Sequence, residues 1–178
     1  MSLLQKLLMH GLLCLSMQFH PVIAAPKIQA GFSPEGSALI LVIQTIERAQ
    51  HSISLMGYSY TSPEITKALV KAHKRGVTVR IILDEKANRN QSSRSAINLL
   101  VNAGIPLRTN NNFAIMHDKV MVVDASTLQT GSFNYTRAGA RKNSENVLVI
   151  HGIPELAQTY LKHWQSRWDT GTDWKSSY

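Results

Sequence analysis

Hydrophobic and polar positions along the chain fall into blocks that predict alternating helices and strands. In three segments between residues 33 and 104, apolar side chains recur every three or four positions, the spacing of a helix with one buried face. Two apolar segments, 52–58 and 77–83, separate these helices and predict strands. The apolar positions of the three helices are Leu39, Val42, Ile43 and Ile46, then Ile65, Ala68, Leu69 and Ala72, and finally Ala96, Leu99, Leu100 and Ala103.

Local signals mark where these helices begin and end. Ser33 and Pro34 predict the start of the first helix, since proline is favoured at the first helical position. Thr61, followed three residues later by Glu64, predicts a capping box at the start of the second helix. Gly76 and Gly104 suit the left-handed conformation that commonly follows the last helical residue.

Strands predominate in the second half of the chain, before one last helix. The predicted strands are 105–108, 115–123, 127–133 and 145–150. The last helix begins at Pro154, and its apolar face comprises Leu156, Tyr160, Trp164 and Trp168. This order of elements predicts a single α/β domain, with α+β character, in which helices cover the faces of a mixed β-sheet.

The first 25 residues differ in composition from the rest. Lys6 supplies a positive charge, residues 7–19 are mostly apolar, and small residues at 22–25 offer a site to signal peptidase. The apolar run is shorter than the roughly 20 residues that a transmembrane helix needs. We therefore predict a signal peptide at 1–25 and a secreted or periplasmic domain at 26–178. An uncleaved amphipathic anchor is the alternative.

Charge and cysteine content narrow the class of partner. The formal net charge is +8, and the predicted leader holds one lysine and no other charged residue, so the mature chain keeps +7 (8 − 1). Such an excess favours nucleic acid or an anionic membrane surface, although the same charge would also serve solubility. Cys14 is the only cysteine and lies in the leader, so the mature domain is expected to have neither a disulfide nor a thiolate site.

A run of 18 residues carries a pattern of reactive and phosphate-binding side chains. The pattern is His-x-Lys-x4-Asp-x6-Gly-Ser-x-Asn, formed by His117, Lys119, Asp124, Gly131, Ser132 and Asn134. Because side chains alternate along a strand, His117 and Lys119 are expected on one face, and Ser132 and Asn134 are expected to share a face in the same way. Gly131 has no Cβ, so a bound group could approach the backbone closely there.

These side chains suit the cleavage of a phosphate ester. Imidazole is a side chain that can attack phosphorus when neutral and can act as an acid when protonated, and His117 carries one. The ammonium of Lys119, with a hydroxyl and an amide downstream, can hold oxygens that gain charge in the transition state. Taken singly, each residue has an ordinary structural explanation. Asp124 has the opposite strand parity to His117, which indicates a structural carboxylate at the strand end.

The pattern resembles the HxK(x)4D(x)6GSxN signature of the phospholipase D superfamily, and all six positions match. The chain carries one copy, as do the small bacterial nucleases of the Nuc type. The resemblance implies the phospholipase D-like fold in a single domain. It also implies an important aspartate at Asp124. An acidic residue just after the motif is implied to hydrogen-bond the catalytic imidazole, and Glu145 occupies that position.

The residues and the resemblance together define the predicted site. The catalytic residues are His117, Lys119, Asp124 and Glu145, and the substrate-binding residues are Gly131, Ser132 and Asn134. No metal ion or other cofactor is expected, since Lys119 would repel a cation and can itself supply positive charge. A metal site formed by His117, Asp118 and Asp124 is the alternative, but neighbouring residues of a strand point to opposite faces.

A single motif per chain predicts a homodimer. Hydrolysis through a covalent phosphohistidine needs a nucleophile and a separate acid for the leaving oxygen. One histidine cannot serve as both at the same instant. A symmetric homodimer with the site at its interface would place two copies of the motif around one scissile phosphate.

The predicted function is that of a metal-independent endonuclease that cleaves DNA without sequence specificity, with RNA open as a second substrate. No stable membrane insertion is expected after removal of the leader. Two other functions stay open: a phospholipase D acting on lipid phosphodiesters, and a nucleic-acid-binding protein with a vestigial site. Contacts to the nucleic-acid backbone are expected from two basic clusters, which are Arg137, Arg141 and Lys142, and Lys71, Lys74 and Arg75.

Overall fold

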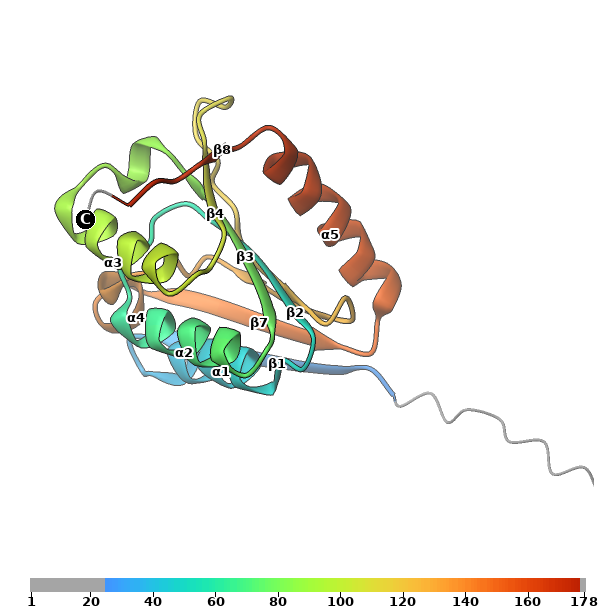
Figure 1. Ribbon diagram of the computed structural model, residues 1–178. Coiled ribbons are helices and arrows are strands. Elements are labelled where there is room, and N and C mark those ends of the chain that lie inside the picture. The colour runs from blue at the N-terminus through green and yellow to red at the C-terminus, as the bar shows by residue number, and fades with distance from the viewer. Residues whose placement is uncertain (1–24, 177–178) are drawn as a thin grey trace, which may run out of the picture.

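The computed structural model describes residues 25–176, so the predicted leader, 1–25, lies almost wholly outside the described residues. These residues form an eight-stranded sheet with helices on both faces (Figure 1). The strand order is β1-β7-β6-β5-β2-β3-β4-β8. The predicted mixed sheet in a single α/β domain is thereby confirmed.

Parallel pairing is confined to the strands that are separated by helices along the chain. β2, β3 and β4 pair in parallel, whereas every other neighbouring pair is antiparallel. A parallel neighbour requires a crossover connection, which α2 and α3 provide. The strands are β1 (Lys27–Ser33), β2 (Ser52–Gly57), β3 (Thr78–Asp84), β4 (Leu107–Asn110), β5 (Lys119–Val123), β6 (Thr127–Gly131), β7 (Glu145–His151) and β8 (Thr172–Asp173).

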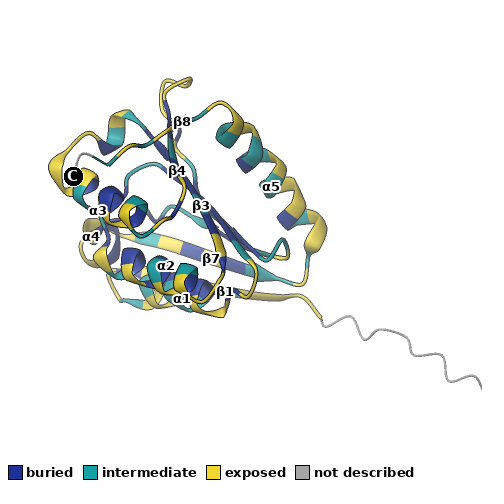
Figure 2. Cartoon of the chain, viewed as in Figure 1, coloured by how far each residue is buried: buried dark blue, intermediate teal, exposed yellow. Residues whose placement is uncertain are grey.

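The helices divide unequally between the two faces of the sheet. The first four pack against one face and share one large apolar core with it, whereas α5 packs on the central strands of the other face through Ala157 and Trp164. Figure 2 shows the buried stripe of α5 turned toward the sheet. The helices are α1 (Ser37–Arg48), α2 (Pro63–Lys74), α3 (Gln91–Asn102), α4 (Arg137–Arg141) and α5 (Pro154–Asp169), with a 3-10 turn, η2, at Lys86–Asn88.

The start of the first helix differs from the prediction. Residues 27–33 form β1, which the hydrophobic pattern did not predict, and α1 begins at Ser37 rather than at Ser33. β1 exists because it pairs along its whole length with β7, a partner more than 100 residues away in the chain. Only tertiary pairing could identify this strand, since its outward face is apolar rather than polar.

The cap of α2 and the buried face of α3 each differ from the prediction by one residue. Ser62, not Thr61, caps α2, and its hydroxyl accepts a hydrogen bond from the Ile65 backbone N–H at 3.3 Å. On α3, Leu99 is 59% exposed, while Ile97 and Leu100 are buried. The apolar face of α3 is therefore rotated by one residue from the predicted one.

The sheet brings the motif to one edge. β5 begins at Lys119 rather than at residue 115, and it runs antiparallel to β2 so that Lys119 lies opposite Gly57. β6 ends at Gly131 and its antiparallel partner β7 begins at Glu145. The end of β2, the start of β5, the end of β6 and the start of β7 therefore lie side by side. This row of strand ends, which carries the motif, is the catalytic edge. Within residues 25–176, no helix is long and apolar enough to cross a membrane.

Candidate active site

His117 and Lys119 converge on the ring of Tyr58. His117 is exposed just before β5, and its ring lies edge-on to that of Tyr58, with centroids 4.7 Å apart. The Lys119 Nζ lies 5.2 Å from the Tyr58 centroid and donates a 2.7 Å hydrogen bond to the His117 carbonyl. The two motif side chains thus meet on one side of the chain, as their spacing predicts, with a tyrosine as their common support.

The Lys119 ammonium sits in an unusually enclosed place for a lysine. The residue is only 6% exposed. Burial lowers the pKa of Lys119, and the negative charges of Asp118 and Glu145 oppose that shift without cancelling it. A partly desolvated cation interacts more strongly with a phosphate than a solvated one does, because less water screens it.

Ser132 and Glu145 form a hydrogen-bonded pair on the same edge. The Ser132 hydroxyl donates to Glu145 Oε2 at 2.5 Å and accepts from the Asn146 backbone N–H at 3.0 Å. Asn143 donates to the other carboxylate oxygen of Glu145 at 2.9 Å. The resemblance placed Glu145 against the imidazole of His117. Within this subunit its carboxylate instead holds Ser132, because β7 starts directly beside the end of β6.

Gly131 and Asn134 play different parts. Gly131 has φ 148°, and a Cβ there would collide with the carbonyl oxygen of Asn146. The glycine is therefore required for the close approach of β7. The approach of a bound group to this backbone stays a prediction. The amide oxygen of Asn134 is buried without a hydrogen-bond partner among residues 25–176. Its amide nitrogen also has no partner in that range, so it remains available to an oxygen of a substrate.

Asp124 lies at the opposite end of β5 from the motif histidine. Its carboxylate accepts three backbone hydrogen bonds, from Gln50, His51 and Ser52, at 2.9, 2.7 and 2.8 Å. It lies five positions along the strand from Lys119, a distance of about 17 Å. The catalytic assignment of Asp124 is thus corrected to a structural one, which its strand parity had indicated.

The three backbone donors stabilise the ionised form of Asp124. Burial raises the pKa of the Asp124 carboxyl, but the three N–H groups more than offset this and hold the pKa below its usual range. A carboxyl whose pKa is lower in the folded state contributes stability that is fully present above the unfolded pKa. That contribution is lost as the pH falls below about 4, through the folded pKa.

Asp124→Asn is expected to destabilise the protein without impairing its chemistry. The asparagine tolerates the left-handed backbone at this position (φ 51°) but removes the charge. We expect the free energy of unfolding at neutral pH to fall by about 1 to 3 kcal/mol, with a weaker dependence on pH in the acid range. Urea denaturation at several pH values measures this, with Asp169→Asn as an exposed control. Lost turnover in a variant of unchanged stability would instead make Asp124 catalytic.

The residues of the alternative metal site are kept apart. Asp118 points toward α5, where His163 lies 3.3 Å from its carboxylate. Asp124 binds the backbone at the far end of β5, as described above. Across residues 25–176, no three His, Cys, Asp or Glu side chains come together in a cluster able to hold a metal ion.

Sequence reasoning missed Tyr58 and Asn146. Tyr58 ends a predicted strand, but its place beside His117 and Lys119 depends on the pairing of β2 with β5. Asn146 contacts Ser132 through its backbone and side chain. Both residues lie at strand ends, so a rule that examined the ends of predicted strands for polar and aromatic residues would have found them.

Known proteins resemble the chain over most of its length. Residues 42–168 match the family model described as cardiolipin synthase, PLD-like domain. Phospholipase D of Rickettsia felis is 36% identical over 141 residues, which cover 79% of this chain and 69% of that protein. Mitochondrial cardiolipin hydrolase of Mus musculus is 32% identical over 142 residues, which cover 80% of this chain and 63% of that protein.

A solved structure matches both fold and sequence. Nuc from Salmonella typhimurium, described as a phospholipase D family member, has a TM-score of 0.84 and 53% sequence identity. The match covers 85% of this chain and 100% of that chain. The similarity is therefore not limited to the motif, since it includes the sheet and the helices that position it.

Proposed function

The chain belongs to the phospholipase D superfamily and is a phosphodiesterase, and from this premise we propose that it is a sequence-nonspecific endonuclease acting on DNA. The observation that carries the proposal is the 53% identity to Nuc over all of that chain. It agrees with the single motif copy, the feature by which the sequence resembles the Nuc-type nucleases. An intact motif in a family of phosphodiesterases sets aside the vestigial alternative.

The chemistry proceeds in two steps through His117. A ring nitrogen attacks phosphorus, a P–N bond forms, and the bond from phosphorus to the leaving oxygen breaks while that oxygen takes a proton from an acid. Water then attacks the phosphohistidine, gives its proton to the same group acting as a base, and the P–N bond breaks. His117 suits this part because its side chain is exposed at the sheet edge.

Lys119 and Asn134 supply the charge stabilisation. The ammonium of Lys119 and the side-chain amide of Asn134 hold phosphate oxygens as negative charge builds on them. Ser132, held by Glu145, lies on the same edge. A lysine fixed beside the nucleophile can do the electrostatic work of a metal ion, so the proposed reaction needs no metal.

The acid of the first step comes from a second copy of the chain. His117 of the partner subunit would protonate the leaving oxygen and later activate water, in a homodimer whose twofold axis passes through the site. An exposed apolar patch supports this arrangement. It consists of Ile28, Phe32 and Leu148, which are 61%, 53% and 38% exposed, and we call it the β1–β7 patch.

The β1–β7 patch reaches the motif. Its three side chains share the face of the sheet on which α5 packs, but α5 covers the central strands and leaves β1 exposed (Figure 2). Phe32 pairs with Asn146, and Asn146 contacts Ser132. Contiguous exposed apolar surface of this kind marks an interaction site. A partner seated there would lie next to the motif edge.

A lipid phosphodiesterase is the second candidate. The Rickettsia felis relative is a phospholipase D and the mouse relative is a cardiolipin hydrolase, so lipid substrates occur among relatives of this chain. The attack at phosphorus would be the same for both substrates. The two functions differ only in what surrounds the scissile phosphate.

Plasmid and lipid assays separate the two candidates. We expect nicking and degradation of plasmid DNA in excess EDTA, because no metal takes part in the proposed reaction. Vesicles of phosphatidylcholine or cardiolipin should release no head group or phosphatidic acid at a comparable rate. Rapid lipid hydrolysis with intact plasmid would establish the second candidate. Loss of nicking in EDTA would overturn metal independence.

A further inference from the structure

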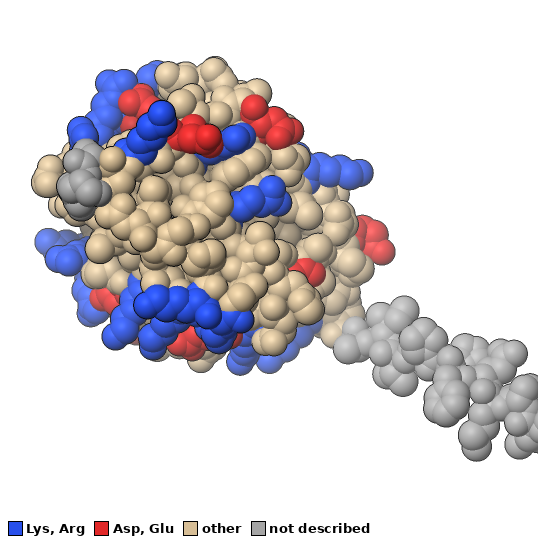
Figure 3. Space-filling view, in the orientation of Figure 1, with Lys and Arg blue, Asp and Glu red and all other residues tan. Residues whose placement is uncertain are grey.

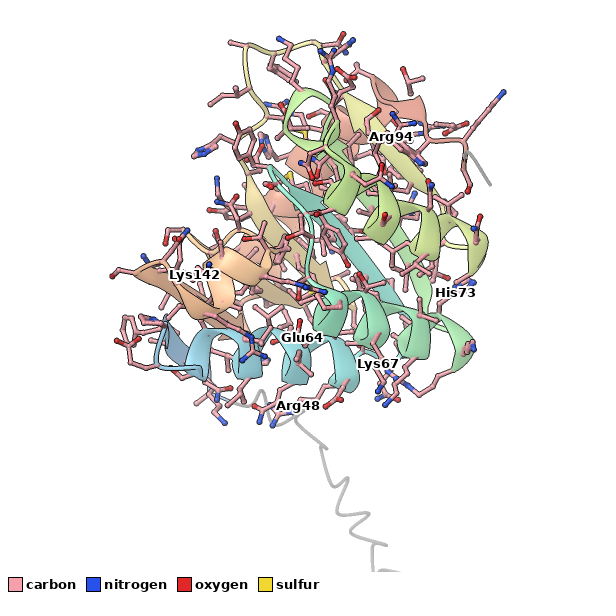
Figure 4. All side chains as sticks on the ribbon, turned by 90° about the vertical axis from the view of Figure 1, so that its left-hand side faces the viewer. Arg48, Glu64, Lys67, His73, Arg94 and Lys142 are labelled. Carbon is pink, nitrogen blue, oxygen red and sulfur yellow. The ribbon has the colours of Figure 1, made fainter. Side chains whose placement is uncertain are left out.

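A groove lies beside the motif, on the face of the sheet that α1 to α4 cover. It encloses about 810 Å³ between the N-terminal ends of α2 and α3 and the short helix α4, and neither His117 nor Lys119 lines it. Its polar walls include Thr61, Ser92, Ser95, Arg137, Arg141 and Lys142, and we call it the helix groove. Figure 4 looks onto this region, with Lys142 beside α4 and Glu64 on α2.

The helix groove is cationic. Three basic residues line the groove: Arg137 and Arg141 of α4, and Lys142 just after it. Among the described residues, no Asp or Glu lines it. Arg141 forms a 2.9 Å ion pair with Glu64 at the rim. Arg137 and Lys142 have no acidic partner within ion-pair distance in the part of the chain that the structure describes. Two exposed positive charges are therefore unneutralised, where a polyanion could contact them.

The basic side chains of the helix groove are distinct from those of the α1 and α2 surface. Figure 3 shows a group of Lys and Arg side chains over the region where Figure 1 places α1 and α2. Lys67 and Lys71 are exposed on α2 and do not line the groove. They have the same charge without the concave setting, so they provide a matched control. Lys71 belongs to the second basic cluster from which the sequence predicted backbone contacts, so the comparison also decides between the two clusters.

Hydrogen bonds fix the helix groove to the catalytic edge. The N–H groups of Thr61 and Ser62 donate to the Tyr135 carbonyl at 2.9 and 3.0 Å, which joins the start of α2 to the segment before α4. Asn88, fully buried, donates to the Tyr58 carbonyl at 2.7 Å and accepts from the Tyr60 N–H at 3.0 Å. These bonds hold one wall of the groove at a constant position relative to Tyr58.

The distance between groove and site is short. Asn134 precedes Arg137 by three residues, so their Cα atoms are at most about 11 Å apart. Tyr58, which supports His117, precedes Thr61 by the same number. A polymer with one phosphate at His117 would therefore present a neighbouring phosphate near the cations of the groove.

We propose that the helix groove binds the stretch of a single nucleic-acid strand next to the scissile phosphate. The inference rests on the proposed nuclease function and extends it to the form of the substrate. A phosphodiester polymer offers phosphates beyond the one cleaved, which match Arg137 and Lys142. The residues that line this groove include three cations, four hydroxyls and two amides, which can contact phosphates, while carbon atoms make up most of the lining surface. The charges favour a phosphodiester polymer, and a lipid is the other outcome of the test below.

The lining also indicates how the strand is bound. No aromatic side chain among the described residues lines the groove, so bases have no aromatic ring to stack on there, and the proposed contacts are to backbone phosphates. Such contacts position a strand without reading its sequence. The concave volume lies within the range of pockets that enclose a ligand segment, which suits one strand rather than a duplex.

Charge neutralisation in the helix groove tests the proposal. Arg137→Gln combined with Lys142→Gln is compared with Lys67→Gln combined with Lys71→Gln. Binding of a fluorescent single-stranded 12-nucleotide DNA is measured by anisotropy over a range of salt concentrations, each pair being placed in the His117→Ala background. The groove pair should weaken binding about 10-fold and reduce the slope of log affinity against log salt by about 1.4, or 0.7 per charge. The control pair should change both quantities much less.

Turnover measurements in the active background separate binding from folding. The groove pair should lower kcat/KM for the oligonucleotide about 10-fold, chiefly through KM, and leave hydrolysis of bis(p-nitrophenyl) phosphate unchanged, because that small diester fills only the catalytic edge.

Equal losses on both substrates, or equal weakening by both pairs, would overturn the proposal. Weakened binding to cardiolipin vesicles with unchanged oligonucleotide binding would show a lipid surface instead. If the wild type cleaves plasmid but the groove pair binds the oligonucleotide normally, the groove proposal is refuted and the nuclease function is kept. Absence of plasmid cleavage refutes the nuclease function, while the anisotropy measurement still decides the groove.

Discussion

Replacing His117 by alanine will lower the rate of phosphodiester cleavage by at least about 10⁴-fold, because the variant loses the proposed nucleophile and, in a dimer, the proposed acid as well. The side chain is exposed and its ring contacts that of Tyr58. Its removal leaves the buried core intact, so the fold should persist. The loss should therefore appear in kcat, with little change in the unfolding transition.

Plasmid nicking, with and without EDTA, measures this effect. His51→Ala is the matched control, since His51 is an exposed histidine near Asp124, at the far end of the sheet. Rapid quenching of the wild type with labelled substrate should trap acid-labile label on the protein, and the His117→Ala variant should trap none. Substantial turnover without the imidazole would contradict the mechanism. So would a complete absence of trapped label when turnover is fast.

Placing charge in the β1–β7 patch will separate the proposed dimer and lower activity by about 100-fold or more, because each subunit then lacks a general acid. Phe32→Asp combined with Leu148→Asp puts two carboxylates on the exposed face of neighbouring strands, where an apolar partner would have to bury them. Sedimentation at the assay concentration gives the oligomeric state. Ile40→Asp is the control, since Ile40 is 57% exposed on α1, away from this patch. A monomeric variant that keeps full activity would show that one chain suffices.

Mixed dimers provide an independent test of the shared site. If both histidines act on one phosphate, a dimer of one wild-type and one His117→Ala subunit should be nearly inactive. After refolding with a ninefold excess of His117→Ala chains, the activity per wild-type subunit should fall to about a tenth. Undiminished activity per wild-type subunit would mean that each subunit is catalytically independent.

Much of the fold follows from local patterns of hydrophobicity. The strands predicted at 52–58 and 77–83 correspond to β2 and β3, and Pro154 does begin the last helix. These elements have strong apolar periodicity and lie in the two cores, so burial and local preference agree. The elements that were missed or misplaced depend on distant partners. β1 is defined by pairing with β7, and the exposure of Leu99 follows from how α3 is rotated on the sheet.

The same division holds for the site. His117 and Lys119 come from alternate positions of one extended segment, so their spacing alone places them together. Tyr58 and Asn146 join them only because β2 pairs with β5 and β7 pairs with β6. The role of Gly131 also depends on that second pairing, since the group that approaches it is a carbonyl of β7.

By itself the sequence determined which side chains could act on phosphorus and that one chain carries a single set, because both depend only on residue type and short spacing. Strand parity also indicated the structural role of Asp124, although its three backbone donors became visible only in the fold. The tertiary structure decided that, within one subunit, Glu145 holds Ser132, and that the β1–β7 patch and the helix groove flank the motif. These relations join residues from separate strands and helices. Their distances are set by sheet order and helix packing, which no local pattern specifies.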